Sequence, residues 1–132
     1  MIGMDKMSQA RWDLAAEMYK RAGDNGGWTL DVHQVAGPKY GYSVGGNPLV
    51  PEWVIPSFRD MPGPFVIQQV SRYLENIDAA GMDWSGGWVD DDGALVLDSP
   101  SILLTRVAAI RLGHKRGEQA IYCLHTGETI TL

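Results

Sequence analysis

The side chains of this 132-residue chain that could carry chemistry are few and widely spaced. Three histidines, His33, His114 and His125, share no i, i+4 or H-x-H spacing, so they do not match a zinc site. A single cysteine, Cys123, excludes a disulfide within the chain and a cysteine-based zinc site. Cys123 is in phase with Ile121 on an alternating strand, which favours a small core residue. A Cys–His dyad with His125 on the same strand face is the alternative.

The densest acidic cluster is Asp90, Asp91 and Asp92. Hard cations bind clustered carboxylates, but a Ca²⁺ loop spaces its ligands at alternate positions and closes on a glutamate, which this segment lacks. The Asp92-Gly93 dipeptide between apolar runs is a strong signal for a hairpin turn. Because the turn explains the cluster, we predict no metal ligand here.

The glycines of Gly41–Gly46 resemble a phosphate-binding loop only superficially. Asn47 and Pro48 follow them in place of a helix, so no helix N-terminus is available to a phosphate. The chain also lacks a G-x-S-x-G elbow, a Walker lysine and an H-E-x-x-H motif. We therefore predict no catalytic residue and no cofactor. A site for a small ligand or substrate near Gly41–Gly46 and the proline-rich segment 49–63 is kept as an alternative.

Hydrophobic periodicity, turn residues and capping residues predict the elements that must position these groups. Ser99 is the expected N-cap of the last helix, with Pro100 after it and Gly117 as its C-terminal cap. The elements are helix 5–22, strands 28–35 and 40–44 paired as a hairpin, edge strand 53–55, helix 65–80, hairpin 87–98, helix 100–116 and hairpin 119–131. They predict an α+β fold, with a mainly antiparallel sheet built from hairpins and packed against about three helices. We expect one domain over residues 1–132, with helix 5–22 as an element that could dock separately.

Glycine and tryptophan are unusually abundant, with 16 and 5 residues. Trp53 lies in the proline-rich segment, and Trp84 lies in Gly81–Gly87, which we expect to be a flexible loop. Exposed aromatic side chains beside proline and glycine are typical of interface anchors, although the same residues could cover the edge of a core. The predicted contact residues are Trp53, Trp84, Tyr42, Trp12 and Tyr19.

The charge of the chain restricts its partners. Lys and Arg total 11 against 16 Asp and Glu, a net charge of −5, which makes nucleic-acid binding through neutralised phosphates a poor candidate. Residues 1–7 have no apolar signal sequence, and no stretch reaches the ~20 apolar residues of a membrane helix. We therefore expect a cytoplasmic protein with no membrane partner.

The C-terminal third carries a series of short motifs that resemble the C-terminal part of uncharacterised small proteins of actinobacteria and their bacteriophages. In those proteins the order is also hairpin, helix, "A-I-Y/W" strand and "G-E" turn. The matching segments are Gly87-Trp88-Val89-Asp90, Val96-Leu97-Asp98, Ala109-Ile110-Arg111-Leu112-Gly113, Gln119-Ala120-Ile121-Tyr122 and Thr126-Gly127-Glu128. The resemblance implies an actinobacterial or phage origin and transfers no catalytic residue.

These observations predict a small non-enzymatic interaction protein, encoded by a phage or mobile element, that binds and modulates a host protein. One alternative is the small-ligand-binding protein or enzyme with a site near Gly41–Gly46. Another is a structural or assembly subunit of a phage particle, which would form homo-oligomers.

Overall fold

The computed structural model describes residues 6–132, so residue 5 of the predicted first helix lies outside the described residues. The described chain contains three α-helices, one short 3₁₀ helix and eight strands. In chain order these are α1 (Lys6–Asn25), β1 (Gly27–Asp31), β2 (Tyr42–Val44), β3 (Trp53–Ile55), the 3₁₀ helix η1 (Phe58–Asp60), α2 (Gly63–Ala79), β4 (Trp84–Val89), β5 (Leu95–Asp98), β6 (Ser101–Leu103), α3 (Arg106–Lys115), β7 (Ala120–Cys123) and β8 (Thr129–Thr131).

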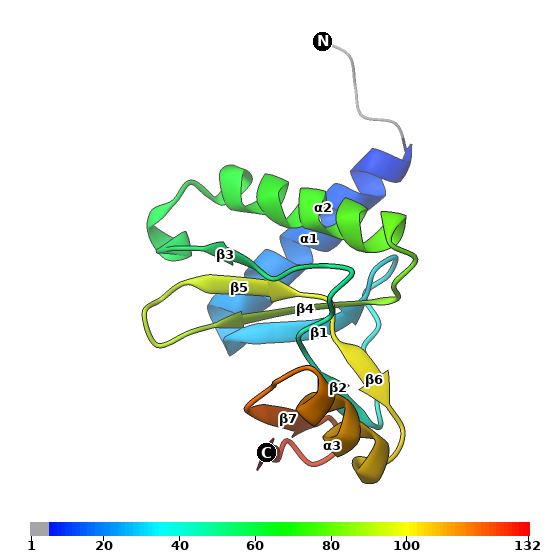
Figure 1. Cartoon of the computed structure of the whole chain (residues 1–132). Helices are drawn as coiled ribbons and strands as arrows, with labels where there is room; N and C mark the ends of the chain where they lie inside the picture. Colours follow the sequence, from blue (N-terminus) through cyan, green and yellow to red (C-terminus); the bar gives the residue numbers. More distant parts are fainter. Residues whose placement is uncertain (1–5) are drawn as a thin grey trace.

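The strands form two antiparallel sheets of four strands each (Figure 1). Sheet A has the order β1-β4-β5-β3, and sheet B has the order β6-β2-β7-β8. Helices α1 and α2 lie together on one side of sheet A, and α3 packs against β2, β6 and β7 of sheet B. This arrangement confirms the predicted α+β class with its antiparallel strands and three helices, but divides the strands between two sheets.

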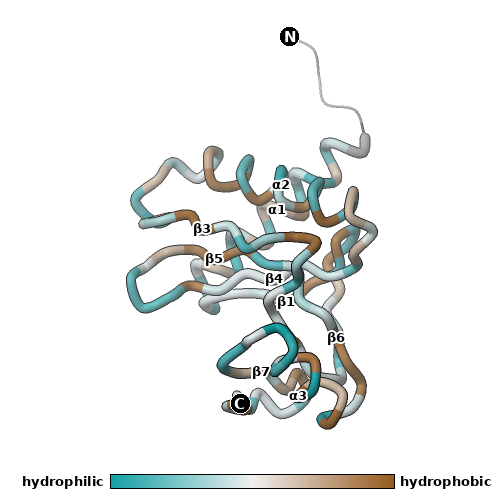
Figure 2. Tube along the Cα trace, viewed as in Figure 1, coloured by the Kyte–Doolittle hydropathy of each residue, from teal (hydrophilic) through white to brown (hydrophobic). Residues whose placement is uncertain are grey.

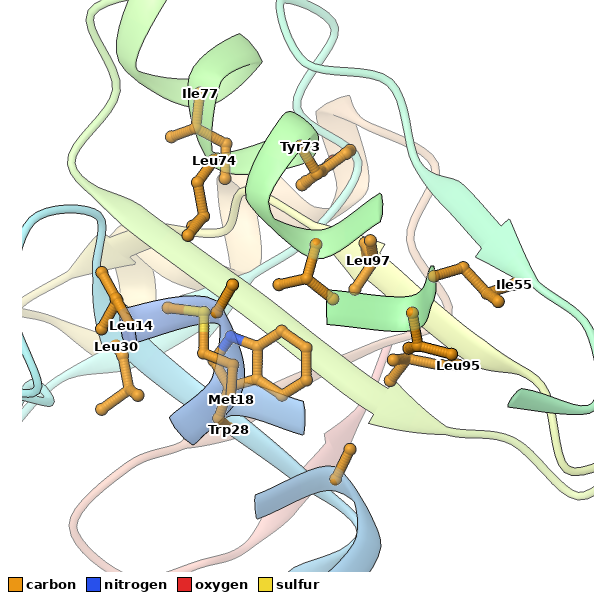
Figure 3. Packing of buried hydrophobic residues seen from close by; sticks show 14 of the residues in the cluster. Leu14, Met18, Trp28, Leu30, Ile55, Tyr73, Leu74, Ile77, Leu95 and Leu97 are labelled. Carbon is orange, nitrogen blue, oxygen red and sulfur yellow. The ribbon is translucent and has the colours of Figure 1, made fainter. Parts of the chain in front are cut away.

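The larger hydrophobic core lies between sheet A and its two helices (Figure 3). The predicted stripes of α1 and α2 face this core, because apolar residues at spacings of three and four share one side of a helix. Its fully buried members include Met18, Leu30, Leu74 and Leu97. The Trp28 indole also lies here, and its Nε1 donates a hydrogen bond to Ser85 Oγ at 3.1 Å.

The smaller core lies between sheet B and α3. It is built from Val44, Ala109, Ile121, Cys123 and Ile130. The prediction that Cys123 is a small core residue is confirmed, because the side chain is 2% exposed.

Several local predictions agree with the structure. The predicted hairpins 87–98 and 119–131 correspond to the β4–β5 and β7–β8 pairs, and the strand at 53–55 lies at an edge of sheet A. Figure 2 shows the turn between β4 and β5 as hydrophilic. In this turn Asp90 Oδ1 accepts hydrogen bonds from the backbone N–H groups of Asp92 and Ala94, both at 2.9 Å. One oxygen of the acidic triplet is therefore engaged by the turn itself.

The predicted helix over 100–116 is wrong in its first third. Residues 101–103 form β6, which pairs with β2, and the helix begins only at Arg106. Thr105 is the N-cap, with its Oγ1 accepting a hydrogen bond from the Ala108 N–H at 3.2 Å. The expected N-cap, Ser99, instead donates to the Trp84 carbonyl at 2.8 Å, which ties β4 to the chain after β5.

The predicted hairpin between 28–35 and 40–44 does not form. β1 pairs with β4, whereas β2 pairs with β6 and β7 in the other sheet. The reason lies in side-chain fit: Trp28 is opposite Gly87 and its ring fills the space where a Cβ on Gly87 would lie. Trp84 is the first residue of β4, so it does not lie in the expected flexible loop. The glycine-rich segment that follows Trp84 is part of the same strand.

Candidate functional site

The faces of the two sheets that carry no helix line a common cleft of about 880 Å³. Side chains alternate along a strand, so residues between those of the core point away from it. The lining includes Gly27, Thr29, Gly86, Trp88 and Asp98 from sheet A, and Ser43, Ala120, Tyr122 and Thr129 from sheet B. The volume lies within the range of small-molecule sites, roughly 300–1,000 Å³.

Glycines make room for a carboxylate on the sheet A side of the cleft. Gly86 is opposite Asp98 in the register of β4 and β5. A Cβ on Gly86 would overlap Asp98 Oδ1, and a Cβ on Gly27 would overlap the Gly87 carbonyl oxygen. The glycines therefore permit the close approach of the Asp98 side chain and of the neighbouring backbone.

A second carboxylate, that of Glu118, approaches the same place from the other sheet. A Cβ on Gly45 would lie 2.6 Å from Glu118 Oε1 and 3.3 Å from Asp98 Oδ2. Asp98 ends β5, and Glu118 lies just before β7. Two carboxylates from distant parts of the sequence thus converge beside Gly45.

The end of α3 positions Glu118. Gly117 adopts a left-handed φ of 71°, which favours glycine and confirms its predicted role as the C-terminal cap. The Glu118 N–H then donates to the Gly113 carbonyl at 2.9 Å. This turn carries the chain from α3 towards Gly45, so that Glu118 reaches the cleft.

Arg116 holds the Gly45 loop against the end of α3. Its guanidinium donates to the carbonyls of Val44 and Gly45 at 3.3 and 3.2 Å, and to Ser101 Oγ at 3.0 Å. These bonds fix the backbone beside the two carboxylates. Among the side chains that the structure describes, those of residues 8–132, no ion pair joins Asp98 or Glu118 to a basic group.

The surroundings of Asp98 disfavour its charge. Burial, reinforced by the negative charges of Glu52 and Glu118, raises the pKa of Asp98 from 3.8 to about 7. Burial also raises the pKa of Tyr73 above its ordinary value, and Asp98 and Glu52 add to that shift. Asp98 therefore changes its charge close to neutral pH.

Two half-exposed aromatic side chains flank the cleft. Trp88 on β4 is 47% exposed, and Tyr122 on β7 is 44% exposed. Trp88 lies two residues from Gly86, the partner of Asp98, so Trp88 and Asp98 share one face of sheet A. Exposed rings beside carboxylates offer faces to which a ligand can bind.

Chemically, the cleft combines negative charge with aromatic faces. Its lining includes the two carboxylates and no lysine, arginine or histidine. A pair of carboxylates of which one is half protonated can bind a positively charged group, and in other settings such a pair performs acid–base chemistry.

The sequence-predicted contact residues do not line this cleft. Each is half-buried, and they are distributed over α1, β2, β3 and β4. Trp53 packs beside Tyr73 with ring centroids 6.0 Å apart, and Tyr19 contacts Phe58 edge-on at 6.2 Å. The remaining three are Tyr42, which contacts His125 edge-on at 5.8 Å, together with Trp12 and Trp84. The alternative site near Gly41–Gly46 is closer, since Ser43 and Gly45 line the cleft while the proline-rich segment does not.

The candidate dyad of Cys123 and His125 is present as a contact. Cys123 Sγ lies 3.5 Å from both ring nitrogens of His125, and the Tyr40 ring stacks on His125 at 4.3 Å. Burial raises the pKa of Cys123, but hydrogen bonds from Thr126 and from the backbone of His125 lower it below its ordinary value. Because the thiol is buried in the smaller core, a substrate would have no direct access to it.

Sequence reasoning missed Asp98, Glu118, Trp88 and Tyr122 as a group. A signal existed in the glycine doublets 26–27, 45–46 and 86–87, each of which contributes to the cleft lining. In the sequence, the doublet 45–46 belongs to the Gly41–Gly46 segment and the doublet 86–87 belongs to the flexible loop expected over Gly81–Gly87. Recognising their common purpose requires knowing that the two sheets face each other.

Comparison with known proteins gives no match to this chain among family models, curated proteins or solved structures. None of the helices in the described part of the chain has the length and apolar character needed to cross a membrane. Among the same residues, no three His, Cys, Asp or Glu side chains are grouped so that they could hold a metal ion. The cleft is therefore the feature of the structure that supports a functional proposal.

Proposed function

We propose that the protein is a small-ligand-binding protein and that its binding site is the cleft between sheets A and B. The observation that carries this proposal is the convergence of two carboxylates at Gly45, in a cleft whose walls come from both sheets. A buried carboxylate beside another carboxylate is unfavourable in its charged form. Groups perturbed in this way are concentrated at binding and catalytic sites, which supports ligand binding here.

A fragment screen followed by NMR tests the proposal. Fragments of mixed charge, including amines, sugars and carboxylic acids, are added to the ¹⁵N-labelled protein. Bound fragments should shift the amide signals of Gly27, Gly45 and Gly86. Fragments that perturb only other regions, or none that bind, would contradict the proposal.

A cleft-filling variant sharpens the test. Thr29 points into the cleft from β1, so Thr29→Trp should fill part of the space and weaken fragment binding while the fold is kept. Lys20→Trp, at an exposed position on α1, is the matched control and should leave binding unchanged. Equal binding by the two variants would place the ligand elsewhere.

Binding to another protein is a second candidate function, supported by a different surface. Leu104, between β6 and α3, and Val107, in the first turn of α3, are 71% and 68% exposed, and Tyr40 is 57% exposed. Exposed large apolar side chains are common at protein interfaces. In this second function the protein, encoded by a phage or mobile element, binds and modulates a host protein.

Site-specific crosslinking tests this second function. A photo-crosslinking amino acid at Leu104 should capture one defined host protein, whereas the same group at the exposed Lys20 should not. Capture of a second copy of the chain would instead favour the assembly-subunit alternative. Identical crosslinks from both positions would contradict a specific interface.

A further inference from the structure

We propose that the cleft recognises an organic cation, an ammonium or guanidinium group held between Asp98 and Glu118 and bordered by the rings of Trp88 and Tyr122. This inference rests on the proposed binding function and names its ligand class. It concerns the charge of the ligand rather than the existence of the site.

The charge balance of the site favours a positively charged ligand. Asp98 and Glu118 converge beside Gly45, and no basic residue lines the cleft. The nearest arginine in the sequence, Arg116, is engaged with two backbone carbonyls and a hydroxyl. A ligand that brings its own positive charge would complete the site with charge-assisted hydrogen bonds to both carboxylates.

The position of the aromatic rings also favours a cation. Trp88 shares a face of sheet A with Asp98, and Tyr122 lines the cleft from sheet B. Tryptophan and tyrosine attract cations over their ring faces. The same cation could therefore contact carboxylates and aromatic rings, which an anion could not.

The protonation of Asp98 should depend on whether a cation is bound. The charged groups that raise the pKa of Asp98 are both acidic: Glu52 before β3 and Glu118 before β7. Asp98 in turn raises the pKa of Tyr73 on α2. Burial and the charges of Glu52 and Glu118 raise the pKa of Asp98 to about 7. A bound cation would favour the ionised form, so binding should release a proton near neutral pH.

A pair of probes that differ only in side-chain charge tests the inference. N-acetylarginine amide carries a guanidinium, and N-acetylcitrulline amide replaces it with a neutral urea of nearly the same shape. Calorimetry at pH 8 should show binding of the arginine compound at least tenfold tighter than that of the citrulline compound. N-acetyllysine amide reports on an ammonium group in the same way.

Two variants assign the effect to the carboxylates. Asp98→Asn and Glu118→Gln should each weaken binding of the arginine compound about tenfold or more. Asp91→Asn, in the exposed turn between β4 and β5, is the control and should leave affinity unchanged. Because Asp98 titrates near pH 7, the affinity of the unmodified protein should rise about tenfold from pH 6 to pH 8, and Asp98→Asn should remove this dependence.

The outcomes separate the inference from the function on which it rests. Cleft binding of neutral or anionic fragments, blocked by Thr29→Trp, with no preference for the arginine compound, would overturn the cation assignment and leave the binding function standing. Absence of any cleft binding would overturn both. If a short arginine-containing peptide binds more than tenfold tighter than the single amino-acid amide, the cation belongs to a polypeptide rather than to a free small molecule.

Discussion

Ionisation of Asp98 should make the folded protein less stable as the pH rises. Its pKa is about 7 in the folded state, because burial and the charges of Glu52 and Glu118 disfavour the carboxylate. In the unfolded chain the same group returns to its ordinary value, near 3.8. Between these values the folded state binds more protons than the unfolded state, so the free energy of unfolding falls with increasing pH.

The size of this effect follows from the pKa difference. Each pKa unit corresponds to about 1.4 kcal/mol, and integration between pH 5 and pH 8 gives a loss of about 3 kcal/mol. Such a loss is a large part of the stability of a small domain. Asp98→Asn keeps the shape of the neutral carboxyl group and removes the titration. The stability gap between this variant and the unmodified protein should therefore widen by about 3 kcal/mol from pH 5 to pH 8.

Urea unfolding followed by tryptophan fluorescence measures this gap. The same measurements on Asp91→Asn, whose side chain is exposed in a turn, should show no change with pH relative to the unmodified protein. The difference between the variants isolates the contribution of Asp98 from that of every other titrating group. A gap that stays constant, or that narrows towards pH 8, would refute the assignment of Asp98 as an unpartnered buried carboxylate.

Three further stability differences follow from the packing around β4 and α3, and urea midpoints test each. Gly87→Ala should destabilise the folded protein by about 1–3 kcal/mol, because the added Cβ would overlap the Trp28 ring. Gly23→Ala, in open space on α1, should stabilise it by about 0.5–1 kcal/mol. Equal effects of the two substitutions would show that the Trp28 ring is free to move. Ser85→Ala should cost about 1–3 kcal/mol, since the Trp28 indole N–H would lose its buried partner, and an unchanged midpoint would mean that another acceptor replaces it. Thr105→Ala should cost about 1 kcal/mol by removing the cap of α3, with Thr105→Ser restoring most of it; failure of the serine to do so would argue against a capping role.

The elements that sequence reasoning located best are those whose signal is local. The α2 helix has a clear apolar stripe, a proline in its first turn and Gly81 after its end, and the structure has all three. The hairpin between β4 and β5 follows from Asp92-Gly93 between apolar runs. Such features depend on a few neighbouring residues, so a single sequence is enough to find them.

The failures occur where the deciding partner is distant in sequence. Ile102, Leu103 and Leu104 are apolar and fit a helix as well as a strand, and only the pairing of residues 101–103 with β2 selects the strand. Ser99 has the chemistry of an N-cap but uses its hydroxyl on the Trp84 carbonyl. Leu104 and Val107, both within the predicted helix 100–116, are exposed, and the buried residues of α3 are Ala109 and Gly113.

The candidate site depends on distant partners even more strongly. Nothing local relates Asp98 to Glu118, because residues 99–117, which include β6 and α3, separate them. Their meeting depends on the left-handed turn at Gly117 and on glycines that allow a carboxylate to lie against a strand. From the sequence, the same glycines have the ordinary appearance of turns.

The stability cost of Asp98 and the proposed ligand class have one physical origin. A carboxylate that loses solvent and gains two negative neighbours raises the free energy of the folded protein when it ionises. Leucine or asparagine at this position would avoid that cost, so a sequence selected for stability alone would not place an aspartate beside Glu118. A cation in the cleft would reverse the sign of the local field and recover the free energy that ionisation costs. The stabilisation gained from a bound cation should therefore be greatest at the pH at which the protein without ligand is least stable.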